Sequence, residues 1–170
     1  MHKTTLYQLC GIPFSGKSTL TRALVKRYGF HVSSVDAMIA KHDFHVASMN
    51  QEDWNLVYAE AYEDLKVALL SGKDSILDKG SLKRSERDTA RRIAEECDAN
   101  YVLIYINTRI EVIQKRRKEN EISRIRGGLE DKYFQIALDQ FVPPQEDESH
   151  TIFNDGLEIE NWMKENFNVN

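Results

Sequence analysis

The sequence is poor in the residues that define several other classes of protein. Among 170 residues it has two cysteines, Cys10 and Cys97, too few for a disulfide scaffold, and we interpret both as small buried apolar residues. Three prolines and eight glycines do not indicate a linker or a low-complexity tail. No run approaches the ~20 apolar residues that cross a bilayer, and no signal-peptide core follows Met1. We expect a cytoplasmic protein without membrane association.

An excess of basic charge is also missing. There are 27 acidic residues against 23 basic ones, a net charge of −4, so we expect no stable binding of nucleic acid. The 41% of hydrophobic and 29% of charged residues are typical of a globular chain. The length predicts one domain over residues 1–170 that buries a core without disulfides. A monomer and a homodimer both stay open.

Strand and helix patterns alternate along the chain. We predict strands at 6–10, 30–35, 75–77, 101–106 and 150–153. Apolar residues at helical spacing predict helices at 19–28, 54–69, 90–97, from 109 into 115–121, at 129–141 and around 159–163. Such alternation predicts a three-layer α/β/α fold, with helices on both faces of a five-stranded parallel sheet.

The strongest motif lies between the first strand and the first helix. Residues 11–18, Gly-Ile-Pro-Phe-Ser-Gly-Lys-Ser, match the G-x-x-x-x-G-K-[ST] phosphate loop in full. Backbone N–H groups of such a loop and the positive end of the following helix bind phosphate oxygens. Lys17 is predicted to reach the β- and γ-phosphates of ATP, and Ser18 to bind Mg²⁺. The other predicted nucleotide-binding residues of the loop are Gly11, Ser15, Gly16 and Thr19.

Two aspartates follow the next two predicted strands. Asp36 is expected to end the second strand and Asp78 the third. Ligands bind at the carboxyl ends of parallel strands, so both carboxylates should face the phosphate loop. Asp78 is the candidate Mg²⁺ ligand together with Ser18, and Asp36 the candidate base for an acceptor hydroxyl. Helix capping or turn formation is the structural alternative for each aspartate.

Arginines gather before a pair of glycines, Gly127-Gly128. Arginine stabilises the charge that spreads over a transferring phosphoryl group, and a mobile segment excludes water. We predict a lid at about residues 115–128, although a solvated charged helix is the alternative. Arg124 and Arg126 are the candidate catalytic arginines, and Arg116 is a candidate for nucleotide binding.

Two further groups of residues allow more than one interpretation. A second basic cluster follows Asp78, and solvated surface is the favoured interpretation over binding of an anionic acceptor. Three histidines lack zinc spacing, so we place them in an acceptor pocket or on the surface. The cluster is Lys83, Arg84, Arg87, Arg91 and Arg92, and the histidines are His31, His42 and His45.

Taken in order along the chain, these motifs resemble the P-loop kinase family that includes phage polynucleotide kinase and chloramphenicol phosphotransferase, many of whose members are described only as AAA-type predicted kinases. The resemblance covers roughly residues 4–155, with Val35-Asp36 and Ile76-Leu77-Asp78 placed as in that family. It implies a P-loop fold of the nucleoside-kinase type with a lid, Asp36 as the activator of the acceptor hydroxyl, and arginines between 116 and 126 in the lid. Members that act on polynucleotides tend to have an arginine soon after the base aspartate. Here only Lys41 is basic nearby.

These features favour a kinase that uses ATP and Mg²⁺ to phosphorylate a hydroxyl on a small molecule or a nucleic-acid 5′ end. The acceptor site is expected in residues 37–70, where Met38, Phe44, Met49 and Trp54 are candidates for its lining. The alternative is an ATP-binding regulator without phosphoryl transfer. A switch GTPase is not supported, because residues 106–109, Ile-Asn-Thr-Arg, do not match a guanine-reading Asn-Lys-x-Asp motif.

Overall fold

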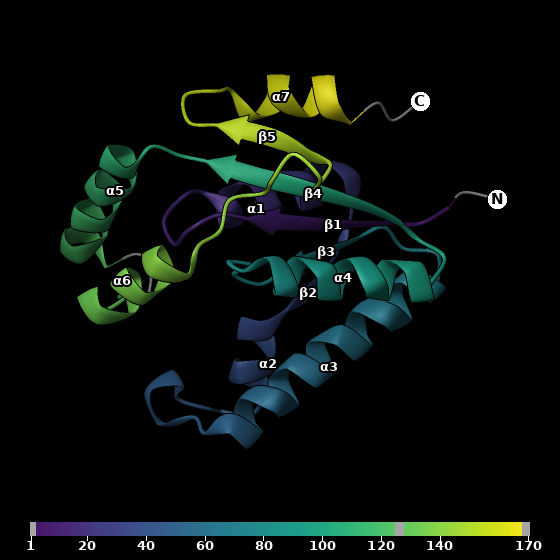
Figure 1. The fold of residues 1–170 in the computed structure, drawn as a ribbon, viewed down its shortest axis with the longest axis horizontal. Coiled ribbons are helices and arrows are strands. Elements are labelled where there is room, and N and C mark those ends of the chain that lie inside the picture. The colour runs from purple at the N-terminus through teal and green to yellow at the C-terminus, as the bar shows by residue number, and fades with distance from the viewer. Residues whose placement is uncertain (1–2, 125–127, 168–170) are drawn as a thin grey trace.

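Strands and helices alternate through the part of the chain that the computed structural model describes, residues 3–124 and 128–167 (Figure 1). The elements in order are β1 (Thr5–Cys10), α1 (Lys17–Tyr28), β2 (His31–Ser34), α2 (Val35–Lys41), the 3₁₀ helix η1 (Val46–Ser48), α3 (Gln51–Leu70), β3 (Ser75–Asp78), α4 (Arg84–Glu96), β4 (Asn100–Asn107), α5 (Ile110–Ser123), α6 (Asp131–Gln140), β5 (His150–Asn154) and α7 (Ile159–Asn166).

The described strands form one five-stranded sheet in the order β2-β3-β1-β4-β5. Every neighbouring pair is parallel, so the carboxyl ends of the strands lie at one edge of the sheet. The central strand β1 pairs with β3 on one side and β4 on the other. The chain thus crosses in opposite directions around β1, which creates the crevice in which parallel sheets bind ligands.

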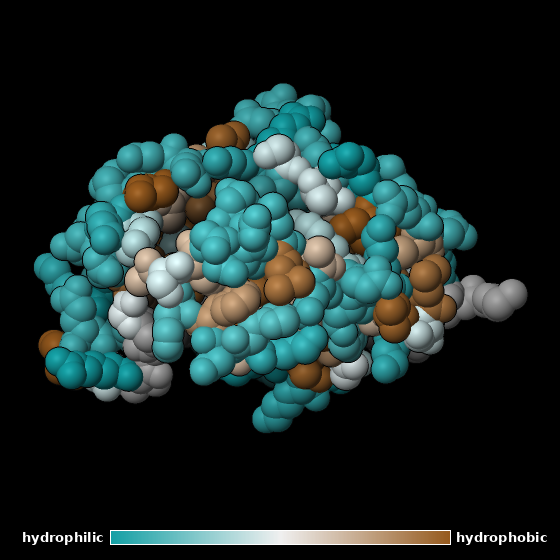
Figure 2. All heavy atoms as spheres, turned by 90° about the horizontal axis from the view of Figure 1, so that it is seen from below, coloured by the Kyte–Doolittle hydropathy of each residue, from teal (hydrophilic) through white to brown (hydrophobic). Residues whose placement is uncertain are grey.

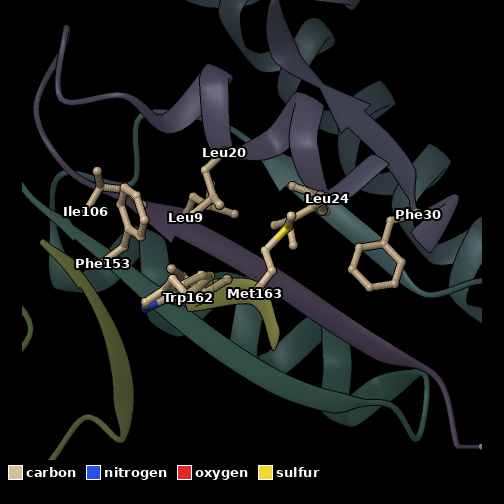
Figure 3. Close-up of a cluster of buried hydrophobic side chains, with 10 residues drawn as sticks. Leu9, Leu20, Leu24, Phe30, Ile106, Phe153, Trp162 and Met163 are labelled. Atoms are coloured by element: carbon tan, nitrogen blue, oxygen red, sulfur yellow. The ribbon is translucent and has the colours of Figure 1, made fainter. Parts of the chain in front are cut away.

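Each face of the sheet is covered by helices. On one face, Leu20 and Leu24 of α1 pack with Leu9 of β1 and with Trp162 and Met163 of α7 (Figure 3). On the other face, Leu6 of the same strand and Leu77 of β3 pack against α3 and α4. Successive residues of a strand point to opposite faces, which explains why β1 supplies both cores. The predicted three-layer α/β/α fold is confirmed.

Several boundaries differ from those expected. The second strand ends at Ser34, so Asp36 lies in the first turn of α2 instead of at a strand end. The reason is local: the Ser34 side chain accepts a hydrogen bond from the Ala37 backbone N–H (3.3 Å) and caps the helix. The third helix begins at Gln51, because Asn50 and Asp53 form a capping box. Cys97 is only half-buried, unlike Cys10.

The surface seen from below is mainly hydrophilic, and its hydrophobic side chains form small separate patches (Figure 2). Within residues 3–124 and 128–167, no helix has the length and apolar character that crossing a membrane requires.

Candidate active site

The phosphate loop connects β1 to α1 at the centre of the sheet edge. Gly11 has φ +155°, and a Cβ built on it would lie 2.9 Å from Ser15 Oγ and 3.0 Å from the Ile106 carbonyl oxygen. Gly16 precedes α1 with φ +116°, a backbone conformation that glycine adopts without strain. These two positions let the loop turn tightly against β4 and enter the helix.

Lys17 is the first residue of α1, and its ammonium group lies inside the loop. Nζ donates hydrogen bonds to the carbonyl oxygens of Gly11 and, at 3.0 Å, of Ile12. Burial lowers the pKa of Lys17 to about 8, although the nearby Asp78 carboxylate acts in the opposite direction. A buried ammonium with only carbonyl partners is well suited to exchange them for anionic phosphate oxygens.

The first turn of α1 supplies the remaining groups of the predicted phosphate site. It contains no acidic side chain, so no side chain of this turn offsets the positive potential that the helix dipole presents to the loop. Ser18 and Thr19 follow Lys17 in this turn, and they line two different cavities. We call these the β3 cavity and the α5 cavity.

The β3 cavity has a volume of about 340 Å³ and brings five predicted site residues together, Gly16, Lys17, Ser18, Asp36 and Asp78. Burial raises the pKa of Asp78, as does the neighbouring Asp36 carboxylate, while Lys17 opposes both effects. This coupling shows that the two carboxylates and the ammonium lie close enough to interact. The described lining residues are Pro13, Phe14, Gly16, Lys17, Ser18, Val35, Asp36, Trp54, Tyr58, Asp78, Lys79 and Gly80.

The α5 cavity is larger, about 560 Å³, and lies on the other side of the loop. Sequence reasoning missed most of its lining, especially the loop that follows β5. The available signal was the Asp155-Gly156 turn after the last predicted strand, since that turn must lie at the same sheet edge. The described residues of the lining are Phe14, Ser15, Gly16, Thr19, Thr108, Arg116, Glu119, Asn120, Ser123, Phe153, Asp155, Gly156, Leu157 and Ile159.

Arg116 of α5 holds the outside of the loop. Its Nη1 donates to the carbonyl oxygens of Phe14 (3.1 Å) and Ser15 (2.7 Å). The Thr108 hydroxyl donates to the same Ser15 oxygen at 2.8 Å. These contacts turn the loop carbonyls outward, toward the α5 cavity. Arg116 thus lies beside the phosphate loop, and its role in nucleotide binding stays a prediction.

Of the predicted catalytic arginines, the structure describes Arg124, and it does not line the β3 cavity. Arg124 is exposed at the end of α5, with φ +49°, and lines neither named cavity. Arg126 lies outside the described residues. Arg117 binds Asp131 at 2.6 Å and lies 4.1 Å from the centre of the Phe134 ring. It therefore joins α5 to α6 instead of reaching the phosphate loop.

The second basic cluster contains a residue that neither sequence interpretation anticipated. Arg87 is fully buried and forms a bidentate ion pair with Glu148. Its Nη1 also donates to the Val142 carbonyl oxygen at 2.9 Å. Arg87 is thus neither solvated nor available to an acceptor, because it joins α4 to the segment between α6 and β5. Nearby, Arg84 pairs with Asp147 at the surface.

Two of the three histidines pair with single carboxylates. His31 Nε2 lies 2.8 Å from Asp64 Oδ2, and His42 Nε2 lies 3.0 Å from Glu60 Oε2. Over residues 3–124 and 128–167, no three His, Cys, Asp or Glu side chains gather in a way that could hold a metal ion. A Mg²⁺ site formed by protein and nucleotide together does not need such a cluster.

Known proteins resemble this chain in sequence. The AAA domain family matches residues 6–139. The chain is 32% identical over 116 residues to the L-seryl-tRNA(Sec) kinase of Methanococcus maripaludis, a match that covers 65% of this chain and 44% of that protein. The chain thus corresponds to less than half the length of this relative.

Two solved structures with the same fold carry the name of a kinase. A putative kinase from Chloroflexus aurantiacus superposes with a TM-score of 0.74 at 14% identity, covering 98% of this chain and 97% of that one. The APS kinase of Mycobacterium tuberculosis, in complex with AMPPNP and APS, superposes with a TM-score of 0.62 at 15% identity, covering 97% and 96%. At such low identity these likenesses establish the fold.

Proposed function

The chain belongs to the AAA domain family, and on that premise we propose that it is a kinase that transfers the γ-phosphate of ATP to a hydroxyl group of a small molecule or of a nucleic-acid 5′ end. One observation supports this most strongly: Lys17, Ser18, Asp36 and Asp78 line the same cavity. A phosphate-binding ammonium, oxygen ligands for Mg²⁺ and a separate carboxylate base are the groups that phosphoryl transfer to an alcohol requires.

The residues present fit a Mg²⁺ ion. Mg²⁺ prefers oxygen ligands and is usually held by one or two protein groups with the substrate phosphates. The Ser18 hydroxyl and the Asp78 carboxylate are such groups, and both line the β3 cavity. When bound there, Mg²⁺ would neutralise charge on the phosphates. Its positive charge would also offset the repulsion that raises the pKa of Asp78.

Asp36 is the proposed general base. It lies in the first turn of α2, where its negative charge is favoured by the helix dipole. Its place in the cavity lets it accept the proton of an acceptor hydroxyl as that oxygen attacks the γ-phosphate. Lys17 would hold the β- and γ-phosphates, releasing its hydrogen bonds to Gly11 and Ile12.

The α5 cavity is the proposed site of the adenine and ribose. It adjoins the outer side of the phosphate loop and is large enough for a nucleoside. Arg116 would keep the loop carbonyls turned outward and add positive charge near the phosphates. In this proposal residues 115–128 act as the lid and residues 37–70 form the acceptor wall of a single domain. Arg124 would reach the phosphates when the lid closes, and Arg126 is the second proposed catalytic arginine.

The test is the Asp36→Asn variant, assayed for transfer of labelled γ-phosphate from Mg-ATP to a panel of alcohols and for ATP binding. We expect ATP affinity to stay within a few-fold, and transfer to fall by about 10²–10⁴-fold, the range for loss of a general base. Asp43→Asn is the matched control, because Asp43 is exposed just beyond α2 and outside the cavity.

Equal loss of binding and transfer in Asp36→Asn would contradict the role of Asp36. ATP binding by the wild-type protein without transfer to any alcohol would favour the alternative, an ATP-binding regulator.

A further inference from the structure

The β3 cavity has an aromatic wall opposite the phosphate loop. Trp54 and Tyr58 lie one turn apart on α3, and their rings stack with centres 5.8 Å apart and planes inclined by 27°. Both line the cavity that contains Asp36. Burial raises the pKa of Tyr58, and the Glu86 and Asp36 carboxylates raise it further.

Besides Lys17 of the phosphate loop, the described lining contains one cation, and its charge is already neutralised. Lys79 lines the cavity beside Asp78, but its side chain is only 7% exposed. Its Nζ lies 2.5 Å from Glu86 Oε1 and 4.7 Å from the centre of the Tyr58 ring. The carboxylate of Glu86 and the face of Tyr58 thus satisfy an ammonium that would otherwise attract an anion.

The segment that carries the aromatic wall is acidic. Residues 37–70 contain six acidic side chains and two basic ones, Lys41 and Lys66. Lys41 lies 3.0 Å from Glu60 and Lys66 lies 2.7 Å from Glu96, so both lysines have carboxylate partners. None of these six acidic side chains is in the described lining of the cavity, but Asp36 and Asp78 are. An acceptor with a phosphate next to its reactive hydroxyl would meet repulsion from these two carboxylates in place of a charged clamp.

From these contacts we infer, on the basis of the kinase function proposed above, that the acceptor is an uncharged or cationic ring-bearing alcohol without a phosphate near its reactive hydroxyl, with its ring against Trp54 and Tyr58. A flat ring face packs on aromatic side chains, and a cationic group on the ring would be favoured by the carboxylates of the cavity. Glu86 is then a specificity-determining residue, because it removes the charge of Lys79 from the pocket.

Binding is measured first, without any need for catalysis. Titrations with two matched pairs of probes, cytidine against cytidine 3′-phosphate and glucose against glucose 1-phosphate, are followed by tryptophan fluorescence. The sequence has two tryptophans, and Trp162 is buried in the core. A change seen in the wild-type protein and absent in Trp54→Phe therefore comes from Trp54. We expect at least one uncharged probe to bind roughly tenfold more tightly than its phosphorylated counterpart.

The second measurement removes the carboxylate that neutralises the charge of Lys79. In Glu86→Gln the ammonium keeps a neutral hydrogen-bond partner but loses its counter-charge. We expect the preference for the uncharged probe to fall by roughly three- to tenfold, as one unscreened charge near the ligand predicts. Glu96→Gln is the matched control, because Glu96 also lies on α4 and pairs with a lysine, Lys66, outside the cavity. Its preference should equal that of the wild type.

Phosphorylated probes that bind as tightly as the uncharged ones, or an unchanged preference in Glu86→Gln, would overturn the inference, as would failure of every uncharged probe to affect Trp54. Failure of the proposed function has a different signature: the uncharged probes bind, but no phosphate is transferred from Mg-ATP.

Discussion

The buried ion pair between Arg87 and Glu148 allows a sharp prediction about stability. Both side chains have no solvent exposure. Arg87 Nε and Nη2 donate to the two oxygens of Glu148 at 2.8 and 2.9 Å. Replacing Glu148→Gln removes the counter-charge and leaves the guanidinium buried with neutral partners alone, backbone carbonyls and the new side-chain amide. Breaking a buried pair in this way costs about 3–5 kcal/mol of unfolding free energy.

The measurement is urea denaturation at neutral pH, followed by far-UV circular dichroism. In a thermal melt of the same variant, a loss of about 3–5 kcal/mol corresponds, for a chain of this length, to a melting temperature lower by roughly 6–20 °C. The neighbouring exposed pair is the control: Arg84 and Asp147 form two hydrogen bonds at the surface, and Asp147→Asn should barely move the midpoint, because solvent screens exposed pairs.

Acid should remove the stability that the ion pair between Arg87 and Glu148 contributes. The hydrogen bonds from Arg87 hold the pKa of Glu148 below its ordinary value. The stabilisation is therefore fully present above the ordinary pKa of a glutamate, about 4.3, and is lost as the pH falls through the lower folded value. The difference between wild type and Glu148→Gln should shrink below roughly pH 4.

A double replacement separates charge burial from packing. Arg87→Met combined with Glu148→Leu removes both charges, so it should recover much of the loss seen in Glu148→Gln. The reasoning would be refuted if Glu148→Gln cost less than about 1 kcal/mol, the range of an exposed pair.

Two predictions concern the nucleotide loop. Burial lowers the pKa of Lys17 to about 8, so the free protein loses this charge above that pH and ATP binding should restore it. Calorimetry at pH 8–9 in two buffers of different ionisation enthalpy should show proton uptake on ATP binding, which should vanish in Lys17→Ala. Arg116→Ala should weaken ATP binding by roughly 10–100-fold, because the carbonyls of Phe14 and Ser15 lose a charged donor. Binding by the exposed control Lys115→Ala should match the wild type, and equal weakening in both variants would contradict the assigned contact.

The chain by itself determined the fold and the phosphate loop. Alternating strand and helix patterns predicted the three layers, and local spacing predicted the turn from Gly11 to Ser18. The carboxyl ends of parallel strands share an edge, so the sequence also predicted that Asp36 and Asp78 would face Lys17, and the structure brings them together. The phosphate loop was inferred from neighbouring residues. The shared edge was inferred from the parallel sheet that the alternating pattern predicts.

The tertiary structure alone decided which distant side chains pair. Arg87 and Glu148 are 61 residues apart, and no local pattern distinguishes Arg87 from the exposed arginines around it. The same holds for the contact between the Lys79 ammonium and the face of the Tyr58 ring, and for the hydrogen bond from Arg116 to the Ser15 carbonyl oxygen. Side-chain charge can be read from the sequence, but burial and pairing depend on how helices and loops pack across the sheet. That packing decides which charges a ligand would meet.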